Sequence, residues 1–258
     1  FSNSDILKRA NRLSAKIFVC IGEQSKNTLV TKLTTSVSDI SFFESDIEAV
    51  TVAVKIINKD KKAVLVVGVG DIDFEQIKTL SGYGKYSYTV CKPYDVESDG
   101  INSSNSVCAV LLCEGSGEYG LNAVTIAKTP LESISETLKK SALEINSIGF
   151  IEGGSNASVA ADRDEVGAIA EIFGQSSTLT SSKGALGYST KNSFLEGICI
   201  AIEGLREGII HSDTGLEHGF SIEATLAYGS KFRDMNTALV NGYDSEDGKW
   251  CSAIVSKM

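Results

Sequence analysis

The sequence contains the segment Cys91-Lys92-Pro93-Tyr94-Asp95-Val96-Glu97-Ser98-Asp99-Gly100, and an apolar stretch follows that ends Leu111-Leu112-Cys113-Glu114. Proline fixes the backbone angle φ, and aspartate and glycine favour tight turns. The segment therefore predicts a turn between strands, with the second strand over residues 107–113.

Helix and strand patterns alternate on both sides of this turn. Before it, we expect strands over residues 16–22, 36–43 and 63–69, a short helix between the first two, and an apolar helix over 45–58. After it, we expect strands at 123–127, 147–151, 178–181, 221–228, 236–243 and 250–256, with helices from 130, over 162–173 and over 190–205. Ser45 with Glu48, and Thr129 with Glu132, have the spacing of helix capping boxes.

This alternation predicts an α/β fold. Strands that alternate with helices form βαβ units around a largely parallel sheet, and the closing run of strands adds antiparallel pairing. No linker rich in Pro, Gly or Ser interrupts the chain near residue 145. We therefore predict a single domain over residues 1–258, composed of two related halves at about 1–145 and 146–258.

The amino-acid composition disfavours two classes of binding partner. The chain has 24 Lys and Arg against 33 Asp and Glu, a net charge of −9 that disfavours nucleic acids and anionic membranes. No apolar run reaches the ~18 residues of a membrane-spanning helix, and the chain does not open on a signal-peptide pattern. We expect a cytoplasmic protein.

Metal and cofactor motifs are not evident in the sequence. Six cysteines are widely spread and several lie in apolar runs, so we expect them to be reduced and buried. Since the only histidines are His211 and His218, we expect no zinc site. The segment Gly68-Val69-Gly70-Asp71 lacks the third glycine of a dinucleotide-binding loop, and we expect no cofactor.

Four segments resemble motifs of the β-ketoacyl synthases, in the same order along the chain. The segment that begins at Cys91 is similar to the family's C-R-P-F-D-x-x-x-D-G. The strand that ends at Ile151 leads into Glu152-Gly153-Gly154 and then, at the family's spacing, into Asp162 and Glu165. This second segment resembles H-G-T-x-T-x-x-x-D-x-x-E with glycine in place of the histidine.

The other two motifs lie in the last third of the chain. The segment from Ser181 to Tyr188 resembles S-x-K-x-x-x-G-H, and Asn241-Gly242-Tyr243 stands where the family has N-S-F. The family's glycine-rich loop is replaced by the charged run Asp244-Ser245-Glu246-Asp247-Gly248-Lys249. That loop lines the acyl thioester site in the family, so its replacement argues against substrate binding.

The resemblance implies a thiolase-like fold with two related βα halves, mixed sheets and buried central helices, here shortened at the N-terminus. It places the family's nucleophilic cysteine at Phe43 and its two histidines at Gly154 and Tyr188, whereas the lysine is retained as Lys183. His211 and His218 match neither histidine motif. Because loss of one general acid or base alone costs ~10²–10⁴ in rate, we expect no condensing activity.

We therefore expect a non-catalytic scaffold or chain-length-factor-like domain of a fatty acid, polyunsaturated fatty acid or polyketide synthase. The resemblance implies a homodimer, or a heterodimer with a ketosynthase, formed by extending a sheet across a two-fold axis. Acyl carrier protein or acyltransferase domains of the same synthase are further expected partners. Two alternatives stay open: an acyltransferase that uses another thiol, such as Cys91, and a module that binds acyl thioesters without reacting them.

Overall fold

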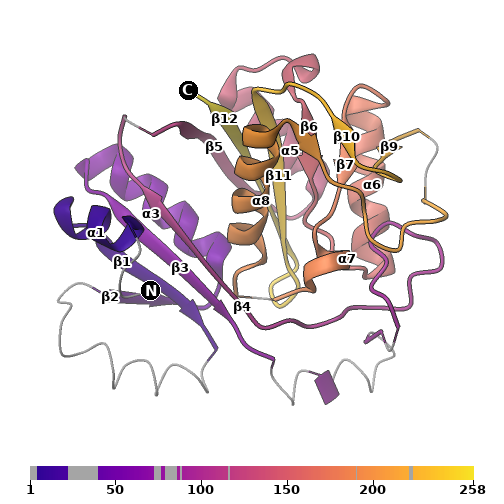
Figure 1. The fold of residues 1–258 in the computed structure, drawn as a ribbon, viewed down its shortest axis with the longest axis horizontal. Helices are drawn as coiled ribbons and strands as arrows, with labels where there is room; N and C mark the ends of the chain where they lie inside the picture. Colours follow the sequence, from indigo (N-terminus) through magenta and orange to yellow (C-terminus); the bar gives the residue numbers. More distant parts are fainter. Residues whose placement is uncertain are drawn as a thin grey trace.

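The computed structural model describes residues 5–22, 40–72, 77–78, 86–87, 89–115, 117–189, 191–220 and 223–258. The short helix expected between the first two strands lies outside the described residues, as do residues 36–39 of the second expected strand. Two main sheets and the helices around them make up the fold (Figure 1). Within the described ranges, no helix is long and apolar enough to cross a bilayer.

The first sheet has four strands in the order β2-β1-β3-β4. β1 pairs in parallel with β2 and β3, whereas β4 runs antiparallel to β3. The interior position of β3 agrees with its unbroken run of apolar residues. The strands are β1 (Lys16–Ile21), β2 (Ile40–Phe43), β3 (Val64–Gly70) and β4 (Ser106–Leu112).

The second sheet has six strands in the order β5-β12-β11-β6-β7-β9. β5, β12 and β11 are antiparallel neighbours, and the remaining pairs are parallel. β9 is shorter than the strand expected over 221–228, because among the described residues 223–228 only Thr225 and Leu226 pair with β7. The strands are β5 (Tyr119–Ala127), β6 (Phe150–Glu152), β7 (Thr178–Thr180), β9 (Thr225–Leu226), β11 (Thr237–Asp244) and β12 (Lys249–Lys257).

The helices predicted from residues 45, 130, 162 and 190 begin within three residues of those positions, whereas the helices over 5–12 and 183–186 were not predicted. Thr129 caps its helix as predicted, since its hydroxyl accepts from the Glu132 amide at 3.2 Å. The capping box at Ser45 is wrong: Ser45 is the N-cap residue, but its side chain makes no capping hydrogen bond. The helices are α1 (Asp5–Arg12), α3 (Asp46–Asp60), α5 (Pro130–Ser141), α6 (Val159–Phe173), α7 (Lys183–Leu186) and α8 (Ser193–Glu207). A 3₁₀ turn (Ile145–Ser147) and a small ribbon of β8 (Ile209–Ile210) with β10 (Lys231–Phe232) complete the described elements.

Two apolar cores stabilise the arrangement. The larger core joins side chains of the four-stranded sheet, α3, α8 and the near face of the six-stranded sheet. The second core lies on the other face of the six-stranded sheet, against α5 and α6. Helices α3 and α8 therefore lie between the two sheets (Figure 1).

Candidate active-site region

Phe43, where the resemblance places the nucleophile, ends β2 in an aromatic environment. Its ring lies against Phe18 of β1, with ring centroids 4.6 Å apart. α3 begins three residues later and carries two acidic residues, Asp46 and Glu48, in its first turn. Acidic groups there offset the positive end of the helix dipole, which is the feature that lowers the pKa of a nucleophilic thiol.

A buried thiol does lie beside Phe43 in the sheet. Cys20 is its cross-strand partner in the pairing of β1 with β2. Burial raises the pKa of Cys20 strongly, and the nearby Asp46 raises it further. Cys20 is thus a protonated core residue at neutral pH rather than a nucleophile.

Asp46 has a structural task at the start of α8. Its carboxylate accepts hydrogen bonds from the amides of Phe194 (2.8 Å) and Leu195 (3.0 Å). These amides have no partner within their own helix, so Asp46 supplies the acceptor that a capping side chain would give. Burial raises the pKa of Asp46 to about 6. The carboxyl group therefore joins the two central helices.

Glu165 organises a closed cluster of neutral donors. Its carboxylate accepts from the amides of Gly154 (3.0 Å) and Ser155 (2.8 Å), from the Tyr94 hydroxyl (2.8 Å) and from Nδ2 of Asn241 (2.8 Å). All four donors meet a side chain that is fully buried. Three of the four family-like segments therefore converge on one carboxylate.

Gly154, where the resemblance places the first histidine, has no room for a side chain. A Cβ atom at this position would lie 2.8 Å from the carbonyl carbons of both Asn241 and Gly242. Backbone atoms of β11 cannot give way as a flexible side chain can. At Gly153, a Cβ atom would overlap the Tyr94 hydroxyl. The histidine position is thus filled by the neighbouring strand.

The turn that opens the Cys91 segment is held by two aspartates. Asp162 accepts from the Tyr94 amide at 2.7 Å, and burial raises its pKa to about 8. Asp95 accepts from the amides of Glu217 (2.7 Å) and His218 (2.6 Å). Asp95, Glu97 and His218 lie close enough to hold a metal ion, but both Asp95 oxygens already accept backbone amides.

Lys183, the retained lysine, lies in a buried charged cluster. It is 1 % exposed, its Nζ donates to the Gly153 carbonyl at 2.9 Å, and Oε1 of Glu152 is 3.6 Å away. Nε2 of His211 lies 2.8 Å from the other Glu152 oxygen. Burial alone would raise the pKa of Glu152, but the His211 hydrogen bond and the Lys183 charge outweigh it and lower that pKa.

Sequence reasoning did not foresee the place of His211. The residue follows the short strand β8, and its partner Glu152 is 59 residues away in the sequence. No local pattern links the two residues. Thr180, the cross-strand partner of Glu152 on β7, donates its hydroxyl to the His211 carbonyl at 2.7 Å and so holds His211 near Glu152.

Tyr188, where the resemblance places the second histidine, is buried and hydrogen-bonded. Its hydroxyl donates to the Tyr243 carbonyl at 2.9 Å, and its backbone amide donates to the Asn102 carbonyl at 2.7 Å. Burial raises the pKa of the phenol well above its ordinary value. Tyr188 is therefore a neutral group whose hydroxyl already donates its hydrogen bond to a backbone carbonyl.

Two of the three family positions, Gly154 and Tyr188, lie against the hairpin of β11 and β12, and the residue after Phe43 is linked to it through Lys191. Gly154 touches its strand at Asn241 and Gly242, and Tyr188 bonds to it at Tyr243. Beside Phe43, the Glu44 carbonyl accepts from Lys191, whose Nζ also lies 3.3 Å from Glu246 at the turn of the hairpin. The positions that the resemblance assigns to the family's catalytic residues therefore lie around one hairpin.

An acidic groove of about 330 Å³ opens next to this region. Five carboxylates and one lysine supply its charged lining, and they come from the start of α3 and the hairpin turn. An anionic thioester carrier would be repelled there. The lining residues are Glu44, Ser45, Ile47, Glu48, Ile126, Asp244, Glu246, Asp247 and Lys249.

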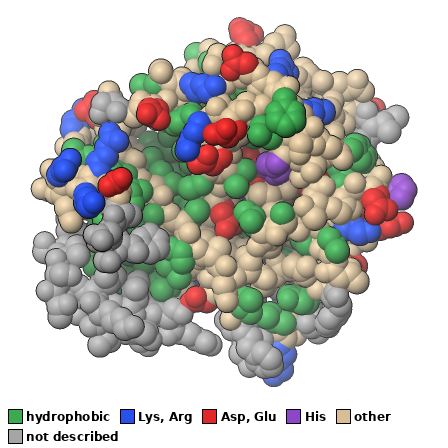
Figure 2. Space-filling view, in the orientation of Figure 1, with side chains coloured by type: hydrophobic (Ala, Val, Ile, Leu, Met, Phe, Trp, Pro, Cys, Tyr) green, Lys and Arg blue, Asp and Glu red, His purple; other side chains and the backbone are tan. Residues whose placement is uncertain are grey.

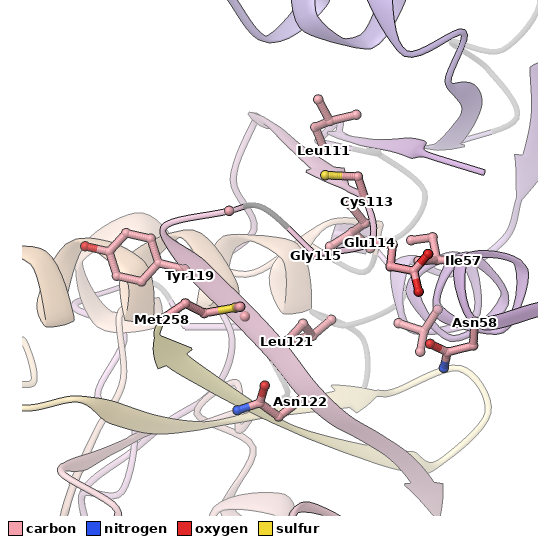
Figure 3. A pocket seen from close by; sticks show the side chains of 14 residues that line it. Ile57, Asn58, Leu111, Cys113, Glu114, Gly115, Tyr119, Leu121, Asn122 and Met258 are labelled. Carbon is pink, nitrogen blue, oxygen red and sulfur yellow. The ribbon is translucent and has the colours of Figure 1, made fainter. Parts of the chain in front are cut away.

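A second hollow, of about 270 Å³, lies away from these positions (Figure 3). Its walls come from the end of α3, the end of β4, β5 and the C-terminal Met258, and the labelled side chains include Leu121 and Tyr119. Cys91, the thiol weighed as a substitute nucleophile, does not line it. Cys91 is 1 % exposed, and burial raises its pKa to about 12.

Comparison with known proteins agrees with the fold. The family model "Beta-ketoacyl synthase, C-terminal domain" matches residues 114–217. The ketosynthase from module 6 of the bacillaene synthase of Bacillus subtilis 168 has the same fold, with a TM-score of 0.82 over 95 % of this chain at 12 % identity. The chain has the thiolase-like fold of the ketosynthases, and its residues 114–217 resemble their C-terminal domain.

Two further solved structures resemble this ketosynthase-like domain. The ishigamide ketosynthase/chain length factor matches 95 % of it with a TM-score of 0.77 at 12 % identity, over 76 % of its own chain. A type II polyketide synthase acyl-carrier protein in complex with its ketosynthase matches 90 % of it, and 66 % of that chain, with a TM-score of 0.74 at 13 % identity. The domain spans 55 % of the bacillaene ketosynthase. A search of curated protein sequences gave no significant match.

Proposed function

We propose that this ketosynthase-like domain is non-catalytic and acts as a scaffold or chain-length-factor-like partner within a fatty acid, polyunsaturated fatty acid or polyketide synthase. The observation that carries the proposal is the packing at Gly154, where strand β11 fills the space that a histidine side chain needs. Phe43 and Tyr188 support it, because neither has the chemistry of the residue that it replaces. The acidic groove beside them disfavours an anionic thioester carrier.

A condensation and decarboxylation assay tests the absence of chemistry. The chain is incubated with acyl and malonyl thioesters of an acyl carrier protein, and released carbon dioxide and condensed product are measured. We expect neither above the protein-free rate, and we expect Phe43→Cys to remain inactive because the oxyanion-stabilising histidines are still missing. Turnover by the unsubstituted chain would overturn the proposal.

The scaffold role predicts a partner. Both edges of the four-stranded sheet, β2 and β4, lack a further strand among the described residues, and sheet extension needs such an edge. Analytical ultracentrifugation of the chain, alone and with ketosynthase-containing proteins encoded alongside it, measures self-association and mixed assembly. A stable dimer or mixed complex is expected, and a monomer that ignores these proteins would contradict the scaffold role.

Amide hydrogen exchange identifies the edge that is used. If β2 extends the sheet across a two-fold axis, exchange at residues 40–43 slows in the complex while residues 106–112 stay unchanged. The opposite pattern would assign the contact to β4.

The ligand-binding alternative predicts instead that fatty acyl ligands raise the melting temperature of the chain, whereas a pure scaffold shows no such shift.

A further inference from the structure

Two cysteines from different layers of the fold meet beside α8. Cys108 lies on β4 and Cys199 on α8, 91 residues apart in sequence, and their sulfur atoms are 3.6 Å apart. Both residues are half-buried, in contrast to the buried Cys20, Cys91 and Cys251. The expectation that the cysteines are buried is therefore wrong for this pair, and also for the half-buried Cys113.

The pair is within reach of a small oxidant. Apolar side chains gather over β4 and α8, and the surface is hollowed between them (Figure 2). Neither Cys108 nor Cys199 is fully buried. A disulfide bond is about 2.05 Å long, so the sulfur atoms must approach by about 1.5 Å, a distance that side-chain rotation can cover.

The hydrogen bond between the thiols makes them unequal. Cys108 donates to Cys199, and this contact lowers the pKa of Cys199 and raises that of Cys108. Burial and the carboxylates of Glu196 and Glu203 oppose the lowering at Cys199 without reversing it. Since the thiolate is the reactive form, Cys199 is the attacking residue and Cys108 the resolving residue.

We propose that Cys108 and Cys199 form a reversible disulfide when the domain meets a peroxide. The Cys199 thiolate attacks the peroxide, so that a sulfur–oxygen bond forms, the oxygen–oxygen bond breaks, and the leaving hydroxide takes a proton to become water. Cys108 sulfur then attacks the Cys199 sulfenic acid, and a second water leaves with the Cys108 proton. Two thiols are oxidised and one hydrogen peroxide is reduced to two waters.

The bond would fasten the edge of one sheet to the helix layer. β4 is the last strand of the four-stranded sheet, and α8 packs against both β4 and the six-stranded sheet. A cross-link here closes a long stretch of chain, which restricts the unfolded state more than a short loop does. The oxidised domain should therefore resist unfolding better than the reduced one, whatever its role in a synthase.

Mass spectrometry of the folded chain tests the inference. The reduced protein is treated with equimolar hydrogen peroxide and digested without reductant. We expect the intact mass to fall by two hydrogens, a cross-linked peptide pair that contains Cys108 and Cys199, and full reversal by a thiol reductant. Unchanged mass, net oxygen addition, or a different cysteine pairing would overturn the proposal.

Single substitutions supply the controls. Cys108→Ser and Cys199→Ser should each abolish the cross-link, while Cys113→Ser, at a half-buried cysteine just beyond β4, should leave it intact. Thermal unfolding gives a second readout: peroxide raises the melting temperature of the unsubstituted chain and reductant lowers it again. Cys199→Ser should show no such change. A rise that persists in Cys199→Ser would show that another reaction is responsible.

Discussion

Glu152 and Glu165 are two buried carboxylates that the fold stabilises by different means. Glu152 has cationic partners, with Lys183 Nζ at 3.6 Å and His211 Nε2 at 2.8 Å, and it also accepts two hydrogen bonds from Ser182. Glu165 is balanced by four neutral donors from backbone amides and polar side chains. In both cases groups of the protein itself compensate a buried carboxylate, in one case mainly by opposite charge and in the other by hydrogen bonds alone.

The largest effect is expected when the neutral cluster loses its acceptor. Glu165→Ala leaves four buried donors unpaired, and each costs ~1–3 kcal/mol, so the loss should exceed about 4 kcal/mol. That is a large share of the ~5–15 kcal/mol by which a domain is stable. Urea unfolding measures it, with Glu171→Ala on the exposed side of the same helix as control. A loss below about 1 kcal/mol would contradict the role given to Glu165.

Removal of the cation from the Glu152 cluster should cost somewhat less. Lys183→Met leaves a buried carboxylate with His211 as its remaining charged partner, and breaking a buried ion pair costs ~3 kcal/mol or more. The double variant Lys183→Met with Glu152→Gln should be more stable than the sum of the two single losses predicts. Additive losses in urea unfolding would show that the two residues do not interact.

A side chain at Gly154 should destabilise the cluster of neutral donors around Glu165. Gly154→Ala forces Cβ against the backbone of β11, and overpacking of this kind costs ~1–3 kcal/mol. Gly167→Ala is the matched control, since nothing lies within 4 Å of its Cβ and alanine favours the helix. If Gly154→Ala is as stable as Gly167→Ala, the position is not closed.

The smallest expected effect is a pH dependence of stability that arises from His211 in the Glu152 cluster. Burial opposes protonation of His211, but its hydrogen bond to Glu152 outweighs burial and raises the His211 pKa above the ordinary 6.5. The stabilisation that comes from pairing protonated His211 with Glu152 is therefore fully present below pH 6.5. It is lost as the pH rises through the pKa of His211 in the folded protein. His211→Gln should remove this slope from the unfolding free energy. Because the His211 side chain is 30 % exposed, solvent screens the gain.

The sequence predicted those parts of the structure that depend on neighbours along the chain. The cap at Thr129, the apolar strand β3 and the order of the family-like segments are local patterns, and they led to the correct fold. The Ser45 prediction was wrong, because its side chain makes no capping hydrogen bond, and the pattern gave no sign that the adjacent Asp46 bonds to α8, far away in sequence. His211 and the closed space at Gly154 also depend on packing between distant strands, which no local pattern describes.

The closed space at Gly154 also bears on the history of the domain. A single codon change could return a cysteine or a histidine to a position, but it cannot move strand β11 or the Tyr94 hydroxyl away from the adjoining glycines. A histidine at Gly154 would therefore lower stability unless strand β11 shifted as well. Under the proposed non-catalytic function, selection would act against such a reversion at Gly154.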